Sequence, residues 1–300
     1  MKKKTYLFAL MAMVLTLGSC SDNENGIGGE TSKYITVSTS IGNMTRVATD
    51  EKGGQTFEEG DEISVYAWTG DATVAPETRD RVVNNANNKL TNGSWVSTPQ
   101  MLWKNNRDKH YFIGVYPTAA ISDLSAGEYT FDETKQVESD LLVAVNKDGL
   151  SYNVDEQQTV PLTFTHVMAK LVVNLTYKNQ WGGIPTVEKV VVGNAAKEAT
   201  INYLTKVVTP STTAKEDFSL PEITENTKYV SVIIPQEDVK QLTIVIGGKN
   251  FVYDNGTPFK LESGKITTVN LEVGRDEIKL GDVKITNWED GSTFSGEALN

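Results

Sequence analysis

The 300-residue sequence has few of the side chains on which catalytic, metal-binding and disulfide-stabilised proteins depend. One cysteine excludes an intramolecular disulfide, and two histidines leave little to act as a base or a metal ligand near neutral pH. The sequence also contains no Gly-x-Ser-x-Gly motif, which would mark a nucleophilic serine. We therefore expect a protein that is not an enzyme, that uses no cofactor or metal, and that is stabilised by buried apolar area.

The few features that look like catalytic or ligand sites have simpler explanations. His110 begins an apolar stretch and His166 lies within one, four residues before Lys170, so we expect both histidines to be buried and hydrogen-bonded to the backbone. The acidic run at 58–62 lacks the spacing of a calcium loop and favours a solvated bend. The glycines at 26–29 do not lie between a strand and a helix, which favours a linker over a phosphate-binding loop.

Positive charge is also scarce. Lys and Arg number 28 against 39 Asp and Glu, which gives a net charge of −11. Loss of residues 1–19, which hold three lysines and no acidic residue, would leave 25 basic against 39 acidic residues and a net charge of −14. Such a chain repels phosphate backbones, so we expect no nucleic-acid partner. The 281 residues that remain are enough for two domains.

The N-terminus has the pattern of a bacterial lipoprotein signal. Three lysines precede an apolar stretch at 5–16 that is too short to span a bilayer, and the sequence LGSC, which ends at Cys20, resembles a lipobox. We expect residues 1–19 to be a signal peptide and residues 20–32 a tether, held in the outer membrane at the cell surface by acyl chains such as palmitate on Cys20. The alternative is an ordinary signal peptide followed by an incidental cysteine.

No window of the remaining chain sustains a helical stripe over three or more turns, and β-branched and aromatic runs dominate instead. The predicted strands lie at 62–68, 110–116, 141–145, 164–177, 187–192, 229–234, 242–246, 266–273 and 283–288. Turn pairs such as Asn92-Gly93 and Gly247-Gly248 separate many of them. The fold class is therefore all-β, with two tandem β-sandwich domains at 33–159 and 160–300 that meet near Val160.

The five tryptophans offer an alternative function, because aromatic rings can stack on sugars. Trp68 and Trp288 lie at strand ends, where burial is expected for so large a ring. Trp95, Trp103 and Trp181 lie near turns, where they could be exposed. A surface glycan-binding lipoprotein would gather such exposed tryptophans on one face.

Seven motifs give the chain a family resemblance. In order, they are FEEGDEISVYAW (57–68), YFIGVYP (111–117), DLLVA (140–144), FTHVMAKLVVNL (164–175), VIIPQ (232–236), LESGKITTVNLEV (261–273) and ITNWEDG (285–291). Together they resemble the fimbrillin family of Bacteroidetes, the Mfa-like and FimA-like pilus subunits, over nearly the whole chain. The resemblance implies transthyretin-like sandwiches and a structural or adhesive subunit of cell-surface fimbriae. A pilus anchor or tip subunit that does not polymerise would share most of these motifs.

The resemblance further implies proteolytic processing after an arginine in the N-terminal segment, and Arg46-Val47 is the matching position. Cleavage there would remove the lipid and the strand at 33–41, whose Ile35, Val37 and Ile41 share one face. The groove left behind would accept a strand of another fimbrial subunit. The alternative is that Arg46 is a loop residue without a role.

The C-terminal run at 277–299 is the candidate donor strand, with a break in its alternation at Asp282. Its apolar residues are Ile278, Leu280, Val283, Ile285, Trp288 and Phe294. The alternative is that this run is the closing strand of the second sandwich. We expect other fimbrial subunits as partners, together with an adhesive target that is a host protein or a glycan.

The lipobox leads to a first prediction. Cys20→Ala removes the only thiol that can carry acyl chains, so the variant should be released into the soluble fraction of cells or accumulate as its precursor. Fractionation of membranes followed by immunoblotting measures this. Ser21→Ala, one residue further on, is the control and should remain with the membrane. A Cys20→Ala protein that still partitions with the membrane would contradict the lipoprotein assignment.

Overall fold

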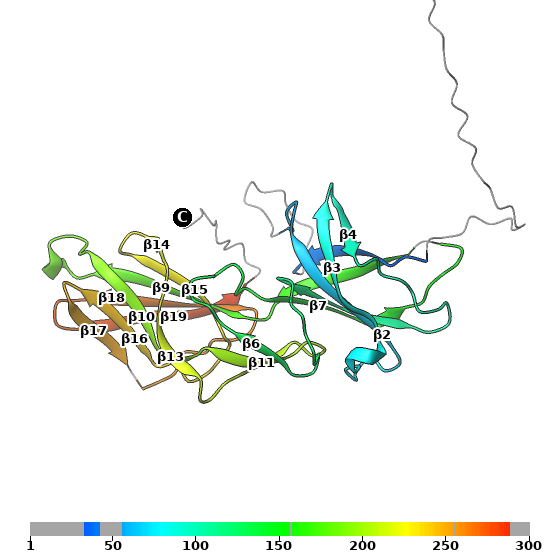
Figure 1. Cartoon of the computed structure of the whole chain (residues 1–300). Coiled ribbons are helices and arrows are strands. Elements are labelled where there is room, and N and C mark those ends of the chain that lie inside the picture. The colour runs from blue at the N-terminus through cyan, green and yellow to red at the C-terminus, as the bar shows by residue number, and fades with distance from the viewer. Residues whose placement is uncertain (1–32, 43–55, 157, 255, 289–300) are drawn as a thin grey trace, which may run out of the picture.

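The computed structural model describes residues 33–42, 56–156, 158–254 and 256–288, and their regular secondary structure is almost entirely β-strand (Figure 1). The described residues contain no α-helix, and two short 3-10 turns, η1 (Thr78–Asp80) and η2 (Asn179–Trp181), are the helical elements among them. The all-β prediction is therefore confirmed. Strands are present at each of the predicted places, although several begin or end a few residues away from the predicted bounds and the run at 164–177 is divided between two strands.

The first half of the chain forms one seven-stranded sheet, in the order β1-β8-β7-β5-β2-β3-β4. Its strands are β1 (Thr36–Ile41), β8 (Thr159–His166), β7 (Leu142–Leu150), β5 (His110–Tyr116), β2 (Glu62–Thr69), β3 (Arg81–Thr91) and β4 (Ser94–Thr98). β2 is an interior strand of this sheet, and its residues 63–68 are buried on both faces, which explains its largely apolar sequence. The sheet curls, so that its two edges approach one another: Tyr34 forms a bridge with Leu102, and Trp95 Nε1 on β4 donates to Thr39 Oγ1 on β1 at 3.0 Å.

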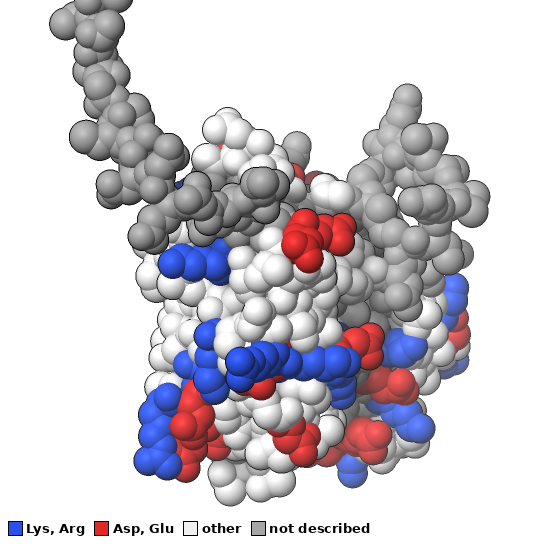
Figure 2. Space-filling view, turned by 90° about the vertical axis from the view of Figure 1, so that its right-hand side faces the viewer, with Lys and Arg blue, Asp and Glu red and all other residues white. Residues whose placement is uncertain are grey.

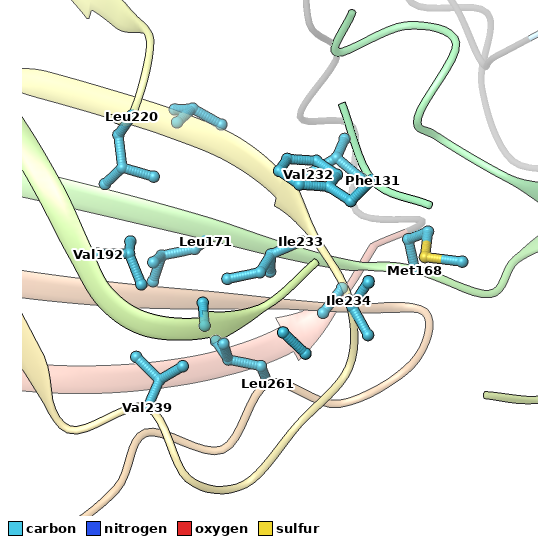
Figure 3. Packing of buried hydrophobic residues seen from close by; sticks show 14 of the residues in the cluster. Phe131, Met168, Leu171, Val192, Leu220, Val232, Ile233, Ile234, Val239 and Leu261 are labelled. Carbon is cyan, nitrogen blue, oxygen red and sulfur yellow. The ribbon is translucent and has the colours of Figure 1, made fainter. Parts of the chain in front are cut away.

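The second half is built from two further sheets. One has the order β13 (Lys215–Ser219), β10 (Val187–Ala196), β16 (Gln241–Ile246) and β17 (Lys249–Asp254). The other has the order β14 (Glu222–Thr224), β15 (Lys228–Ile233), β9 (Ala169–Tyr177), β18 (Lys265–Val273) and β19 (Ile278–Asn287). Leu171, Val192 and Ile233 come from β9, β10 and β15 and point toward one another between the sheets (Figure 3). Their burial makes this half a β-sandwich.

A third, small sheet joins the two halves. It has the order β12 (Val207–Pro210), β11 (Glu198–Asn202) and β6 (Gly127–Thr130), so that β6 from the first half of the sequence pairs with β11 from the second. The Phe131 N–H also donates to the Lys197 carbonyl at 2.8 Å. Buried residues from both halves, including Trp68 and Leu171, belong to one continuous hydrophobic cluster. The halves therefore share packing as well as a sheet.

The change from the first to the second half does not occur at Val160. That residue lies inside β8, which pairs with β1 and β7 of the first sheet, and the second half begins at β9. The predicted single strand at 164–177 is two strands in two sheets, separated only by Val167 and Met168. The connection is made by Val167 and Met168, which are buried and apolar. The sequence therefore shows no glycine, proline or asparagine that would mark the change of sheet.

Two of the predicted turn pairs close hairpins. Asn92 and Gly93 have φ angles of 52° and 73° between β3 and β4, and Gly247 and Gly248 have φ angles of 58° and 71° between β16 and β17. These left-handed conformations are the ones that a two-residue hairpin turn needs, and asparagine and glycine tolerate them best. The two hairpins fix the registers of the outer strands of their sheets.

Close packing around Gly114 of β5 yields a second prediction. A Cβ atom at this position would lie 2.6 Å from Phe164 Cζ and 3.1 Å from Leu162 Cδ1, both on β8. Gly114→Ala should therefore destabilise the first half by about 1–3 kcal/mol through overpacking. The urea midpoint of unfolding measures this loss, with Ser94→Ala at an exposed position of β4 as the control. Equal midpoints for Gly114→Ala and the unaltered protein would show that β8 does not pack as described.

Candidate functional site: two edge strands

β1 lies at one edge of the first sheet, where it pairs with β8 in parallel from Thr36 opposite Thr159 to Ile41 opposite Phe164. Ile35 and Val37 are buried, whereas Ile41 is only partly covered. The predicted apolar face of this segment is therefore the face that packs on the core. In this structure, β1 occupies the place beside β8 that a strand of another subunit was predicted to take.

β8 depends on β1 over most of its length. Among the described residues, positions 159–163 of β8 have no ladder partner except β1, because β7 pairs only with Phe164, Thr165 and His166. The Asn146 side-chain amide donates to the Pro161 carbonyl at 3.4 Å, which is a weak substitute for a strand. Removal of β1 would therefore leave one side of β8 without hydrogen-bonding partners.

A groove of about 640 Å³ runs beside β1, between it and β4. Phe57 and Trp95 form its aromatic wall, with their ring centroids 5.3 Å apart and their planes at 83°. Phe57 also packs edge-to-face on Phe164 of β8. Serine and threonine side chains of β1, including Ser38 and Thr39, line the other side. The groove therefore runs along the outer edge of β1, the strand that the predicted cleavage would remove from β8.

β19 is an edge strand of its own sheet. It contains four of the six predicted donor residues, and a fifth, Trp288, follows it directly. Leu280 is 36% exposed, Val283 40% and Ile285 39%, and Ile278 is partly buried against the core. The register pairs three of them with buried residues of β18, as Leu271–Leu280, Val269–Val283 and Thr267–Ile285. The three side chains therefore share the inner face of the sheet but are incompletely covered.

The predicted break at Asp282 is present as a register shift in β19, opposite the step from Val269 to Leu271. The extra residue allows Leu280 and Val283, which are three positions apart, to lie on the same face. Without the bulge, strict alternation would place them on opposite faces. The run is thus shaped to close its own sandwich, as the alternative interpretation of this segment holds.

Trp288 differs from the other donor candidates, because it is only 3% exposed. Its ring stacks on the ring of His166, with centroids 4.2 Å apart and planes at 6°. The backbone N–H of Trp288 donates to the Gly264 carbonyl at 3.1 Å. The remaining predicted residues, Cys20, Arg46, Val47 and Phe294, lie outside the residues that the structure describes.

The neighbours of His166 correct the expectation that the backbone satisfies it. Its Nδ1 lies 2.7 Å from Asp140 Oδ1, so a carboxylate and the Trp288 ring surround it. Lys170 Nζ also lies near these groups, 5.4 Å from the centroid of the Trp288 ring. Burial lowers the pKa of Lys170 to about 8, which the charge of Asp140 opposes only in part. We call Asp140, His166, Lys170 and Trp288 the junction cluster.

His110 matches its prediction more closely. It is buried, its Nε2 accepts from the Lys104 N–H at 3.0 Å, and its Nδ1 lies 3.1 Å from the Asp108 carbonyl. Burial lowers the pKa of His110, which keeps the ring neutral. Among the described residues, no group of three or more His, Cys, Asp or Glu side chains is arranged to hold a metal ion.

The tryptophans do not form an exposed platform in the described part of the chain. Trp68 and Trp288 are buried as predicted, and Trp103, one of the three that could have been exposed, is buried as well. The Trp103 ring packs edge-to-face on His110 and Phe112, and its backbone N–H donates to the Lys33 carbonyl just before β1. Trp95 and Trp181 remain partly exposed, but they lie in different halves. Acidic and basic side chains are also mixed on the face shown in Figure 2.

Comparison with known proteins identifies the architecture. A family model described as fimbrillin-like matches residues 45–288. The chain belongs to the fimbrillin-like family. It is also 25% identical to a candidate fimbrium subunit, Fim1C of Bacteroides uniformis, with 97% of each protein covered.

Solved structures share the fold of this fimbrillin-like chain. A candidate cell adhesion protein from Bacteroides uniformis matches with a TM-score of 0.63 and 18% identity, over 86% of this chain and all of its own. A second one, from Bacteroides ovatus, matches with a TM-score of 0.61 and 17% identity, over 85% of this chain and 98% of its own. In the described part of the fimbrillin-like chain, no helix is long and apolar enough to cross a bilayer.

The burial of Lys170 in this fimbrillin-like protein predicts a pH-dependent stability. Its pKa in the folded state, about 8, lies below the ordinary value of 10.5, so folding disfavours the charged form. Stability should therefore rise as the pH increases from about 8 to 10.5, by on the order of 3 kcal/mol. Lys170→Met should remove this contribution, so its advantage over the unaltered protein should shrink across the same window.

Chemical denaturation at a series of pH values measures this difference. Lys189→Met replaces an exposed lysine of β10 and is the control, because an exposed ammonium group loses little hydration free energy on folding. A constant difference in unfolding free energy between Lys170→Met and the unaltered protein from pH 7 to pH 10.5 would contradict the assignment.

Proposed function

We propose that this chain, a fimbrial structural or adhesive subunit by its family, assembles with other fimbrial subunits by strand exchange. Cleavage between Arg46 and Val47 would release β1, and a strand of a neighbouring subunit would take its place on β8. The observation that carries this proposal is the pairing of β8. Its residues 159–163 have β1 as their ladder partner among the described residues, and β1 is a short edge strand close to the chain's N-terminal segment.

The free energy of such an exchange is large enough to hold a polymer together. Ile35, just before β1, and Val37 within it are buried and Ile41 is partly covered; the three side chains contribute about 1.5–3 kcal/mol each, and backbone hydrogen bonds add about 1 kcal/mol each. The total is on the order of 10 kcal/mol before the entropy of association is subtracted. An incoming strand with matching side chains would recover most of this free energy.

The C-terminal run supports the part of the proposal in which a donor strand takes the place of β1. β19 is an edge strand, and its apolar row of Leu280, Val283 and Ile285 is more than one-third exposed. An edge strand with an incompletely covered apolar face can leave its sheet at lower cost than a central strand. We propose that this run, or the residues that follow it, is the donor.

The cellular context is part of the same proposal. The chain would be exported as a lipoprotein, anchored in the outer membrane through Cys20, and released into the fimbrium on cleavage. Its role would be structural or adhesive rather than catalytic. A subunit that keeps β1 and its lipid would instead serve as an anchor or tip.

The decisive experiment compares N-termini and assembly. Protein recovered from the cell surface should begin at Val47, and treatment with an arginine-specific protease should convert purified protein into SDS-resistant ladders. Arg46→Ala should block both cleavage at this position and laddering, since β1 then stays on β8. Deletion of residues 290–300 should weaken laddering without affecting cleavage.

Arg107→Ala, at an exposed loop position, is the matched control and should be cleaved and assembled normally. N-terminal sequencing and gel electrophoresis give the two readouts independently. A start at lipidated Cys20 would favour the anchor role. Normal assembly of the Arg46→Ala protein on cells would overturn the strand-exchange proposal.

A further inference from the structure

β8 connects the two strands that the proposed assembly would move. Its residues 159–163 rest on β1, whereas its last residue, His166, carries the ring of Trp288, which directly follows β19. Only three of its residues, Phe164 to His166, are also held by β7. β8 is therefore the strand that links β1 to the residue under Trp288.

The stack anchors the end of β19 to the first half of the molecule. Trp288 is almost fully buried, although the side chains of β19 that precede it are exposed or only partly covered. The pocket beside the stack, about 310 Å³ in volume, is lined by both rings and by residues 263–265 at the start of β18. The C-terminal end of β19 is thus fixed by a contact outside its own sheet.

The position of the His166 ring depends on β8 and on its carboxylate partner. His166 is paired with Leu142 in the ladder, and its Nδ1 lies 2.7 Å from Asp140 Oδ1, just before β7. Both contacts fix the ring plane on which the indole lies. If the end of β8 shifts or frays, the ring turns and the stacking surface is lost.

The contact is also one that can be released. Trp288 Nε1 is buried and has no hydrogen-bond partner among the described residues. A buried donor without an acceptor costs free energy that exposure to water would return. The indole is therefore held by ring contact, by burial and by the nearby Lys170 ammonium, without a directional bond from its N–H.

We infer that the stack of Trp288 on His166 is a latch that keeps β19 in its own sheet until β1 has left. Loss of β1 frees residues 159–163 of β8, the end of β8 loosens, and the stack opens from the C-terminal end of β19. Removal of β1 and release of the donor strand then occur in a fixed order. The consequence for assembly rests on the proposed function, but the coupling itself is a property of the single chain.

Hydrogen exchange on the full, uncleaved chain tests the coupling without any assembly. Val37→Asp places a charge at a buried position of β1 and should detach it from β8. Both Val37→Asp and Trp288→Ala should raise the exchange rate of the β19 amides, by about three- to tenfold, which is the range that a lost aromatic pair implies. Combining the two should raise the rate no further than one alone, because each opens the same latch.

Three variants sharpen the result. Trp288→Phe keeps a ring over His166 and should exchange nearly as the unaltered protein does. Trp181→Ala removes a different tryptophan, whose Nε1 donates to Val273 of β18 at 3.0 Å, and its effect should add to that of Val37→Asp. If Val37→Asp fails to fold, Val37→Ser serves in its place.

Independent, additive effects of Val37→Asp and Trp288→Ala on β19 would overturn the latch, and so would unchanged β19 exchange in the Val37→Asp protein. Neither result depends on whether Arg46 is cleaved. Conversely, a coupled response in exchange together with normal ladders from the Arg46→Ala protein would leave the latch intact and overturn only the strand-exchange proposal.

Discussion

The parallel pairing of β1 with β8 is the contact on which the first half of the molecule depends. Backbone groups in a sheet need partners, and residues 159–163 of β8 have β1 as their ladder partner within the described chain. The same pairing places Ile35 and Val37 over the core and brings Thr39 within reach of Trp95. One six-residue strand therefore satisfies an edge, covers a core and helps to close a curled sheet.

The second half presents the complementary situation at β19. Its hydrogen bonds to β18 are extensive and its bulge keeps Leu280 and Val283 on the inner face, yet the face remains partly exposed. Apolar area left in contact with water is a standing driving force for further burial. β1 occupies a place that another strand could take, and β19 offers a strand whose present place is incompletely covered. These two edges are the ones that would take part in the proposed strand exchange.

Between these edges, the halves are not independent. The pairing of β6 with β11 and the continuous hydrophobic cluster join them, and the junction cluster adds buried polar groups at the crossing from β8 to β9. A buried lysine beside a histidine and a carboxylate is costly to desolvate, and it is stable only when its partners are held in place. The junction is therefore a position where small changes in one half are felt in the other.

Local sequence determined the class of the fold and most of its strands. Runs of β-branched and aromatic residues located β2, β5 and β18, and Asn92-Gly93 located a turn, because these signals act between neighbours in the chain. The family could be recognised from motifs in the same strands. β3 could not be found in this way, since its asparagines are poor strand formers and it is held by pairing with β2 on one side and β4 on the other.

Only the tertiary structure decided which strands and side chains contact one another within the chain. Nothing in the run from Phe164 to Tyr177 reveals that it divides between two sheets, since both parts are equally apolar and the change of sheet occurs at buried residues. Trp103 is buried in one cluster with Ile35 and Val37, which lie far earlier in the sequence. In the same way, His166 acquired Asp140 and Trp288 as neighbours because strands distant in sequence end at one junction. Sequence period specifies which face of a strand is apolar, but only the assembled sheets specify what that face meets.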